Sequence, residues 1–140
     1  MTSTRVSGEE IAVVFDAYAW VEYALDSPKA ALVGDLLDRA SEAYTPASVV
    51  AELIDSMLRH GIAHETVDRI LNFIRSRTVV VPIDSEIADR AGNLNFVKKK
   101  TVKDWGMLDS LVYATATDRG SILTGDPHFK DIPGVIYIGK

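Results

Sequence analysis

The chain has 140 residues, of which 47% are hydrophobic, and it carries 20 acidic side chains against 15 basic ones, for a net charge of −5 at pH 7. This length and composition fit one globular domain that buries its own core. The absence of cysteine excludes disulfides, thiolate nucleophiles and thiolate zinc sites, and the negative charge excludes a surface that is basic overall.

The first ten residues, MTSTRVSGEE, are polar and lack the apolar segment of a signal peptide. No apolar run in the sequence approaches the roughly 18 residues of a membrane-spanning helix. We therefore expect a flexible leader over residues 1–10, a single domain over 11–140, and a soluble, cytoplasmic protein without membrane contact.

The domain begins with alternating strand and helix patterns. Residues 11–15, IAVVF, form a β-branched run that is typical of a strand buried on both faces, and Asp16 follows it directly. Helical patterns cover 17–25 and 28–42, and a brief strand is predicted over 43–45. The helix over 17–25 is apolar nearly all round, which indicates either deep packing under the second helix or an interface with another chain.

A longer helix is predicted next. Thr45 suits its N-cap and Pro46 its first position, and the helical pattern continues to a stop at Gly61. At about 100° per residue, Glu52 lies nearly opposite the centre of the apolar stripe of this helix, so it does not face the helix's own core. A further helix over 64–77 is predicted to pack back as an antiparallel hairpin.

The second half repeats this alternation. A strand over 78–83 precedes a helix that Asp84 or Ser85 can cap. That helix ends in a basic cluster, whose members are Lys98, Lys99, Lys100 and Lys103. Lysines placed here could hold the phosphates of single-stranded or looped RNA, although a charge run is also typical of a solvated helix end.

Two carboxylates lie in the final stretch. The predicted helix that begins at Gly106 carries Asp109, and an Asp-Arg-Gly stop ends it at 118–120. A short strand over 121–123 leads into Thr-Gly-Asp-Pro, which contains Asp126, and a last strand is predicted over 135–138. Strands separated by helices predict an α/β fold, a three-layer α/β/α sandwich with a mostly parallel central sheet.

In a parallel sheet the carboxyl ends of all strands share one edge, which would bring Asp16 and Asp126 together. Asp109 and Glu52 lie off the apolar stripes of their helices and can join them. Each close pair of carboxylates repels by roughly 1 to 4 kcal/mol, and a divalent cation such as Mg²⁺ or Mn²⁺ removes that cost. Such a pocket can activate water and hold a scissile phosphate.

Each acid also has a purely structural explanation. Asp16 could be only a helix N-cap, Glu52 a solvated residue, Asp109 a carboxylate favoured by its helix dipole, and Asp126 a turn residue before proline. Two further polar residues, a possible fifth acid and a possible ligand or base, are expected to be bystanders. These are Asp104, as an N-cap or solvated residue, and His128, as a loop histidine beside Phe129.

Four motifs in this order, spread over about residues 11–138, resemble the PIN domain family and, within it, the VapC ribonuclease toxins of VapBC toxin–antitoxin pairs. The matching segments are VVFDAYAWVEY with Asp16, ASVVAEL with Glu52, LDSLVYATA with Asp109, and LTGDPHF with Thr124, Asp126 and Phe129.

The resemblance implies a PIN-like fold and an endoribonuclease that uses one or two Mg²⁺ or Mn²⁺ ions and leaves 5′-phosphate and 3′-hydroxyl ends. It implies that the catalytic metal ligands are Asp16, Glu52, Asp109 and Asp126, with Thr124 as a supporting hydroxyl. It also implies a small antitoxin that occludes the pocket, and the helix over 17–25 could serve a homodimer or the antitoxin's apolar tail. The family often has Ser or Thr shortly after the first Asp, where this chain has Ala17 and Tyr18. The missing hydroxyl could weaken the orientation of a metal ligand or substrate, so it affects the expected rate of cleavage more than the metal site.

Two other classes of function stay open. In a catalytically silent module that binds nucleic acid or protein, the acids would be solvated caps, and divalent cations would not change thermal stability. In a phosphohydrolase with an aspartyl nucleophile at Asp16, a second Asp two residues later is usual. Tyr18 stands there, which disfavours the phosphohydrolase.

Overall fold

The computed structural model describes residues 11–140, so the leader predicted over 1–10 lies outside the described residues. A five-stranded sheet in the order β3-β2-β1-β4-β5 forms the centre, and every pair of neighbouring strands is parallel. The strands are β1 (Ile11–Phe15), β2 (Ala40–Pro46), β3 (Val79–Val81), β4 (Ser121–Thr124) and β5 (Val135–Tyr137). This arrangement confirms the predicted parallel sheet.

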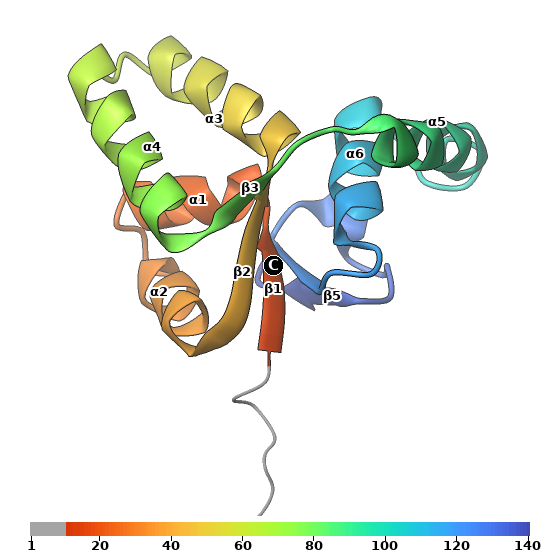
Figure 1. Ribbon diagram of the computed structural model, residues 1–140, viewed down its shortest axis with the longest axis horizontal. Helices are drawn as coiled ribbons and strands as arrows, with labels where there is room; N and C mark the ends of the chain where they lie inside the picture. Colours follow the sequence, from red (N-terminus) through yellow and green to blue (C-terminus); the bar gives the residue numbers. More distant parts are fainter. Residues whose placement is uncertain (1–10) are drawn as a thin grey trace, which may run out of the picture.

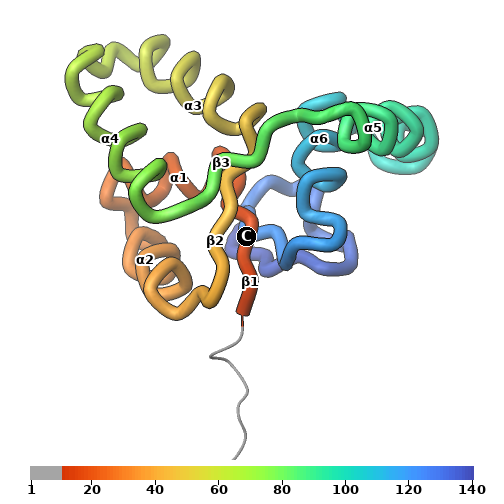
Figure 2. Tube along the Cα trace, viewed as in Figure 1, coloured from red at the N-terminus to blue at the C-terminus, as the bar shows by residue number. Residues whose placement is uncertain are grey.

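Helices cover both faces of the sheet, which confirms the three-layer sandwich. The helices are α1 (Ala17–Ala24), α2 (Ala30–Arg39), α3 (Ala47–Arg59), α4 (His64–Arg77), α5 (Ser85–Lys98) and α6 (Met107–Ala116), and a short 3₁₀ turn, η2 (Pro127–Phe129), follows β4. Helices α1 to α4 lie to one side of the sheet, and α5 and α6 lie to the other (Figures 1 and 2). Over residues 11–140, no helix is long and apolar enough to cross a membrane.

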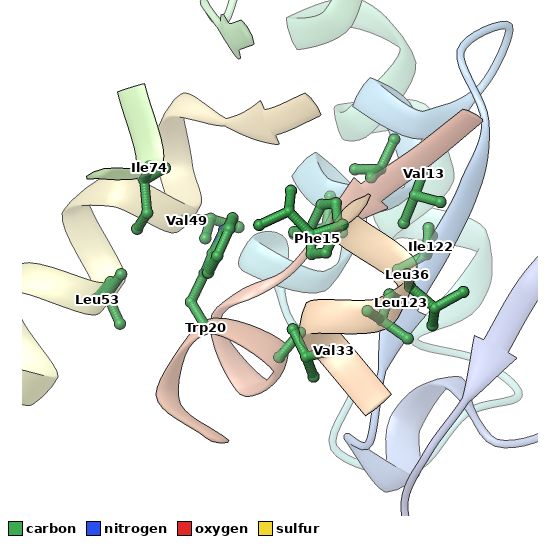
Figure 3. Close-up of a cluster of buried hydrophobic side chains, with 14 of the residues drawn as sticks. Val13, Phe15, Trp20, Val33, Leu36, Val49, Leu53, Ile74, Ile122 and Leu123 are labelled. Carbon is green, nitrogen blue, oxygen red and sulfur yellow. The ribbon is translucent and has the colours of Figure 1, made fainter. Parts of the chain in front are cut away.

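The main core extends over both faces of the sheet, since its buried cluster joins residues of α1 to α4 with residues of α6. The last three residues of β1 are fully buried, as a strand with neighbours on both edges and helices on both faces requires. Phe15 stacks on Trp20 of α1 at a ring-centroid distance of 4.9 Å. Leu53 of α3 and Ile74 of α4 also lie in this cluster (Figure 3). The buried contact between Trp20 and Phe15 therefore holds α1 against the end of β1.

The segment around Thr45 differs from the prediction. It belongs to β2, which is longer than the strand expected over 43–45, and α2 is correspondingly shorter than the helix expected over 28–42. Thr45 does not cap α3, because Pro46 is still extended and pairs with Val81 of β3. Pairing on both edges of β2 thus overrides the local capping pattern.

The Thr45 hydroxyl instead takes part in a buried chain of hydrogen bonds. Trp20 donates its indole N–H to Thr45 Oγ1 at 3.2 Å, and Thr45 shares a 2.8 Å hydrogen bond with the hydroxyl of Thr78. Since Thr78 donates to the Ile74 carbonyl at 2.9 Å, Thr45 is the donor to Thr78. The chain links α1, β2 and the end of α4.

The turn over residues 118–120 sets how closely β4 approaches β1. The predicted Asp-Arg-Gly stop is confirmed, and Asp118 there has a φ of 71°. A Cβ at Gly120 would lie 2.4 Å from the backbone oxygen of Ala12 in β1, a contact that no side chain tolerates. Glycine therefore lets β4 begin directly beside β1, which places the carboxyl ends of these two strands together.

Replacing Thr45 with Val should destabilise the fold, because the buried Trp20 N–H loses its acceptor without a change in side-chain shape. We expect a loss of about 1 to 3 kcal/mol in the free energy of unfolding, measured by urea denaturation. Thr101→Val, at an exposed position, is the control and should change stability by less than about 0.5 kcal/mol. Equal stability of both variants would contradict the role given to this hydrogen-bond chain.

Candidate functional site

The four predicted acids come from four separate parts of the fold and gather at the carboxyl edge of the sheet. Asp16 directly follows β1, Asp126 follows β4, Asp109 lies in the first turn of α6, and Glu52 lies on α3. Burial is the largest cause that raises the pKa of Asp16 and of Glu52; the charge of Asp126 adds to both shifts, and the charge of Asp109 adds to that of Glu52. The carboxylates are therefore close enough to repel one another.

Asp16 is the most deeply buried member of the cluster, with 6% of the residue exposed. Burial raises the pKa of its carboxyl group from 3.8 to about 7, and the charges of Asp126 and Glu52 add to this effect. Hydrogen bonds from Thr124 and from the Ala19 N–H oppose it. Its Oδ1 accepts the Ala19 N–H at 3.0 Å, so Asp16 is both the N-cap of α1 and part of the acidic cluster.

Thr124 links two of the acids. The residue is fully buried at the end of β4, and its Oγ1 accepts the backbone N–H of Asp126 at 3.0 Å. The same hydroxyl lowers the pKa of Asp16 through a hydrogen bond. Thr124, the last residue of β4, therefore links Asp126 to Asp16 at the end of β1.

The positions after Asp16 carry no free hydroxyl of the kind that the family often has. Ala17 has none, and the Tyr18 hydroxyl accepts a hydrogen bond from Lys29 Nζ at 2.9 Å. The Tyr18 ring lies over Gly125, where an added Cβ would meet it at 2.2 Å. Tyr18 thus fills the space behind the turn that carries Asp126, and Thr124 supplies the hydroxyl beside Asp16.

Asp109 and Asp126 are held by backbone groups at their own helix starts. Asp109 Oδ2 accepts the Gly106 N–H at 3.0 Å, and Asp126 Oδ1 accepts the His128 N–H at 2.9 Å. Their side chains are 14% and 35% exposed. Within residues 11–140, hydrogen bonding leaves Asp109 Oδ1 and Asp126 Oδ2 uncommitted. Each acid therefore keeps one oxygen that can face an ion.

Glu52 completes the cluster from the rim. The residue is exposed, on the side of α3 away from the core, as its position opposite the apolar stripe predicted. Partial burial of its carboxyl group, followed by the charges of Asp109 and Asp126, raises its pKa. Glu52 is therefore solvated and part of the cluster at the same time.

His128, which was expected to be a bystander rather than a catalyst, contacts the acids. Its Nδ1 lies 2.8 Å from Asp109 Oδ2 and 3.6 Å from Asp126 Oδ1. The sequence contained a pattern that predicts this placement. The side chain of an aspartate before proline commonly accepts the backbone N–H of the residue two positions later, which here is His128. That turn fixes His128 on the same side as Asp126.

The basic cluster lies at the end of α5 and in the loop before α6. The Lys99 ammonium group is engaged within the chain, because its Nζ donates to the Trp105 carbonyl at 2.7 Å. Lys98 and Lys100 lie over the rings of Tyr113 and Phe96, at 6.0 and 4.1 Å from the ring centroids. Lys103 and Asp104 are exposed, and Gly106, not Asp104, is the N-cap of α6. Asp104 is thus a solvated residue.

The donor atoms present fit a hard divalent cation. Asp109, Asp126 and His128 each offer one ligand atom, and these atoms all lie within 4.8 Å of one another. Asp16 and Glu52 add carboxylates nearby, and within residues 11–140 no lysine or arginine forms an ion pair with any of the four acids. An oxygen-rich pocket with unbalanced negative charge is the chemistry that Mg²⁺ and Mn²⁺ prefer.

The sequence model of the PIN domain matches residues 13–135. The chain therefore belongs to the PIN domain family, which confirms the resemblance drawn from the four motifs. Among curated proteins, none matches this sequence.

Solved structures of toxin–antitoxin proteins share the fold. A toxin–antitoxin complex from Klebsiella pneumoniae aligns with a TM-score of 0.69 at 18% identity and covers 89% of this chain and 96% of that chain. VapBC2 from Rickettsia felis, bound to a promoter DNA fragment, aligns with a TM-score of 0.69 at 17% identity and covers 91% and 97%. Mycobacterium tuberculosis VapC20, a sarcin-ricin loop cleaving toxin, aligns with a TM-score of 0.62 at 10% identity and covers 76% and 82%.

The burial of Asp16 predicts an unusual pH dependence of stability in EDTA. Because folding raises its pKa from 3.8 to about 7, the folded state binds the proton more tightly, and the free energy of unfolding should fall as pH rises from about 4 to 7. Asp16 contributes a slope of at most about 1.4 kcal/mol per pH unit.

Urea denaturation across this pH range, with the variant Asp16→Asn, measures that contribution. Asparagine keeps the N-cap acceptor, so the variant should lose the Asp16 part of the slope. Asp84→Asn is the matched control, because Asp84 caps α5 through the Ile87 N–H at 2.8 Å and lies outside the cluster. An Asp16→Asn profile that parallels the unaltered protein would contradict a raised pKa at Asp16.

Proposed function

We propose that this PIN domain protein is an endoribonuclease that depends on Mg²⁺ or Mn²⁺ and hydrolyses RNA phosphodiester bonds. We further propose that it is the toxin of a toxin–antitoxin pair and acts in the cytoplasm. One observation carries the proposal above all: Asp16, Glu52, Asp109 and Asp126 converge although their mutual repulsion opposes it. A cluster that costs folding free energy is expected where bound cations are part of the function.

In this proposal the four acids are the catalytic residues that hold one or two cations, directly or through water. When bound, a divalent cation lowers the pKa of a water molecule and offsets the charge that develops on the phosphate. Thr124 holds Asp16 and Asp126 next to each other, because its hydroxyl bonds the Asp16 carboxyl group and accepts the backbone N–H of Asp126. Water then attacks phosphorus, and the bond to the 3′ oxygen breaks to leave a 3′-hydroxyl and a 5′-phosphate.

Cleavage of end-labelled total RNA and tRNA tests the proposal. The purified protein should cut with Mn²⁺ or Mg²⁺ and not with EDTA. Asp109→Asn keeps a similar shape and removes the charge, so it should slow cleavage by about 100-fold or more, which corresponds to a loss of about 2.7 kcal/mol or more of transition-state stabilisation.

The matched control for this assay is Asp89→Asn, which changes an exposed aspartate on α5 outside the cluster. It should cut like the unaltered protein. Equal trace activity of Asp109→Asn and the unaltered protein, or no cleavage with any metal, would refute the nuclease. That outcome would favour a catalytically silent binding module.

For the RNA itself we propose contacts with the basic cluster, chiefly Lys98, Lys100 and Lys103, since Lys99 already bonds the Trp105 carbonyl. Beside Lys100 lies Phe96, which is 68% exposed, and an exposed aromatic ring next to a cation suits an unpaired base and its phosphate.

Replacing these three lysines with Ala should weaken RNA binding and flatten its salt dependence. Each lost contact to a single strand should make the negative slope of log K against log salt shallower by about 0.7. The binding is measured in the Asp109→Asn background, so that RNA stays intact. Arg75→Ala, at an exposed basic position on α4, is the control. A salt slope that stays the same in the triple variant would remove the lysines from the RNA site.

We also propose a small antitoxin as partner, and a homodimer. The complexes from Klebsiella pneumoniae and Rickettsia felis support the first of these. On this chain, Leu25 at the end of α1 is 60% exposed. It borders a mainly apolar groove of about 170 Å³ between α1 and the end of α3, whose lining is Val21, Ala24, Leu25, Ser56, Met57, His60 and Ile62. Light scattering that finds only monomer at high concentration would refute the homodimer.

A further inference from the structure

We propose that His128 is a ligand of the metal site through its imidazole nitrogen, and that it makes the site prefer Mn²⁺ to Mg²⁺. This inference rests on the proposed function, because it concerns the cations that the acidic cluster would hold. It adds a residue outside the acidic quartet and a metal preference that four carboxylates alone would not give.

The spacing of the donor atoms supports a ligand role. Ligand atoms in neighbouring positions around an octahedral cation are about 3 Å apart, because each lies about 2.1 Å from the ion. His128 Nδ1 lies 2.8 Å from Asp109 Oδ2 and 3.6 Å from Asp126 Oδ1. Both spacings are close to the expected value, so Nδ1 lies at a separation from each oxygen that a shared ion requires. Asp109 Oδ2 and Asp126 Oδ1 each accept one backbone N–H and keep a second lone pair for the ion.

The backbone that carries the imidazole is also fixed in place before any ion binds. The backbone N–H of His128 donates to Asp126, and the next residue, Phe129, is 1% exposed and packs on Trp105 at a ring-centroid distance of 5.1 Å. Trp105 in turn donates its indole N–H at 2.7 Å to Ser110, the residue after Asp109. The segment with His128 is therefore locked to the start of α6, and ligands held in this way lose little freedom on binding.

The chemistry of the donor set then decides the preference. Mg²⁺ binds almost only oxygen and keeps its waters, whereas first-row transition ions gain affinity from imidazole nitrogen. His128 is 31% exposed, so an ion can reach the ring from solvent. A site of carboxylates with one imidazole should hence bind Mn²⁺ more tightly than Mg²⁺.

The competing role for His128 is a hydrogen-bond donor. At 2.8 Å, Nδ1–H can donate to Asp109 Oδ2 and orient that carboxylate while the ion binds only oxygen. Loss of the ring would weaken metal binding in either role. Direct coordination has to be separated from orientation by detecting nitrogen in the first coordination shell of the bound ion.

Pulsed electron paramagnetic resonance of Mn²⁺ bound to the full chain makes this distinction, because a coordinated ¹⁴N nucleus modulates the electron spin echo. We expect this modulation in the unaltered protein and in His64→Asn, which changes an exposed histidine on α4. It should be absent in His128→Asn. Titration calorimetry should show Mn²⁺ affinity falling by about 10- to 100-fold in His128→Asn, and Mg²⁺ affinity falling less.

Thermal melts in EDTA establish that each variant is folded. Mn²⁺ that binds the unaltered protein without ¹⁴N modulation would overturn the ligand role and leave the nuclease proposal standing. Modulation that persists in His128→Asn would overturn it as well, since another nitrogen would be the ligand. If the unaltered protein binds neither cation, the metal site itself fails, and the proposed function fails with it.

Discussion

The candidate site depends on one interaction, the electrostatic repulsion among its four clustered carboxylates. The fold brings four acids together at one sheet edge, and it buries Asp16 so far that its pKa rises to about 7. Asp16 and Asp126 stand beyond the last residues of their strands, so their carboxyl groups are not part of the apolar core of the sheet. A cost of this kind is accounted for if the site binds cations, which reverse the sign of the interaction.

The fold offsets part of that repulsion locally. Asp16 caps α1, Asp109 lies in the first turn of α6, and Asp126 caps the short turn η2, so three acids sit where backbone N–H groups point outwards. The structural and functional explanations of these residues are therefore compatible. Capping orients each carboxylate and leaves one oxygen of Asp109 and one of Asp126 for another partner.

Sequence reasoning succeeded where a regular pattern fixes the outcome. Apolar strand runs and the rule that parallel strands end at one edge located Asp16 and Asp126, and helical periodicity placed Glu52 off the core. It failed where a tertiary contact decides. Thr45 had a sound local capping pattern, yet it pairs within β2 and accepts a hydrogen bond from Trp20. The Asp-Pro turn explains why His128 lies beside Asp126, but the contact of His128 with Asp109 joins this turn to α6, and no local pattern encodes that contact.

The central claim is that this acidic cluster is a divalent cation site, and crystals grown with Mn²⁺ test it most directly. Anomalous difference density recorded at the manganese absorption edge locates the ion without any assumption about activity. The account predicts a peak between Asp109 and Asp126 that disappears in crystals of Asp109→Asn. Well-ordered carboxylates with no anomalous peak among them, at Mn²⁺ concentrations that saturate ordinary sites, would contradict it.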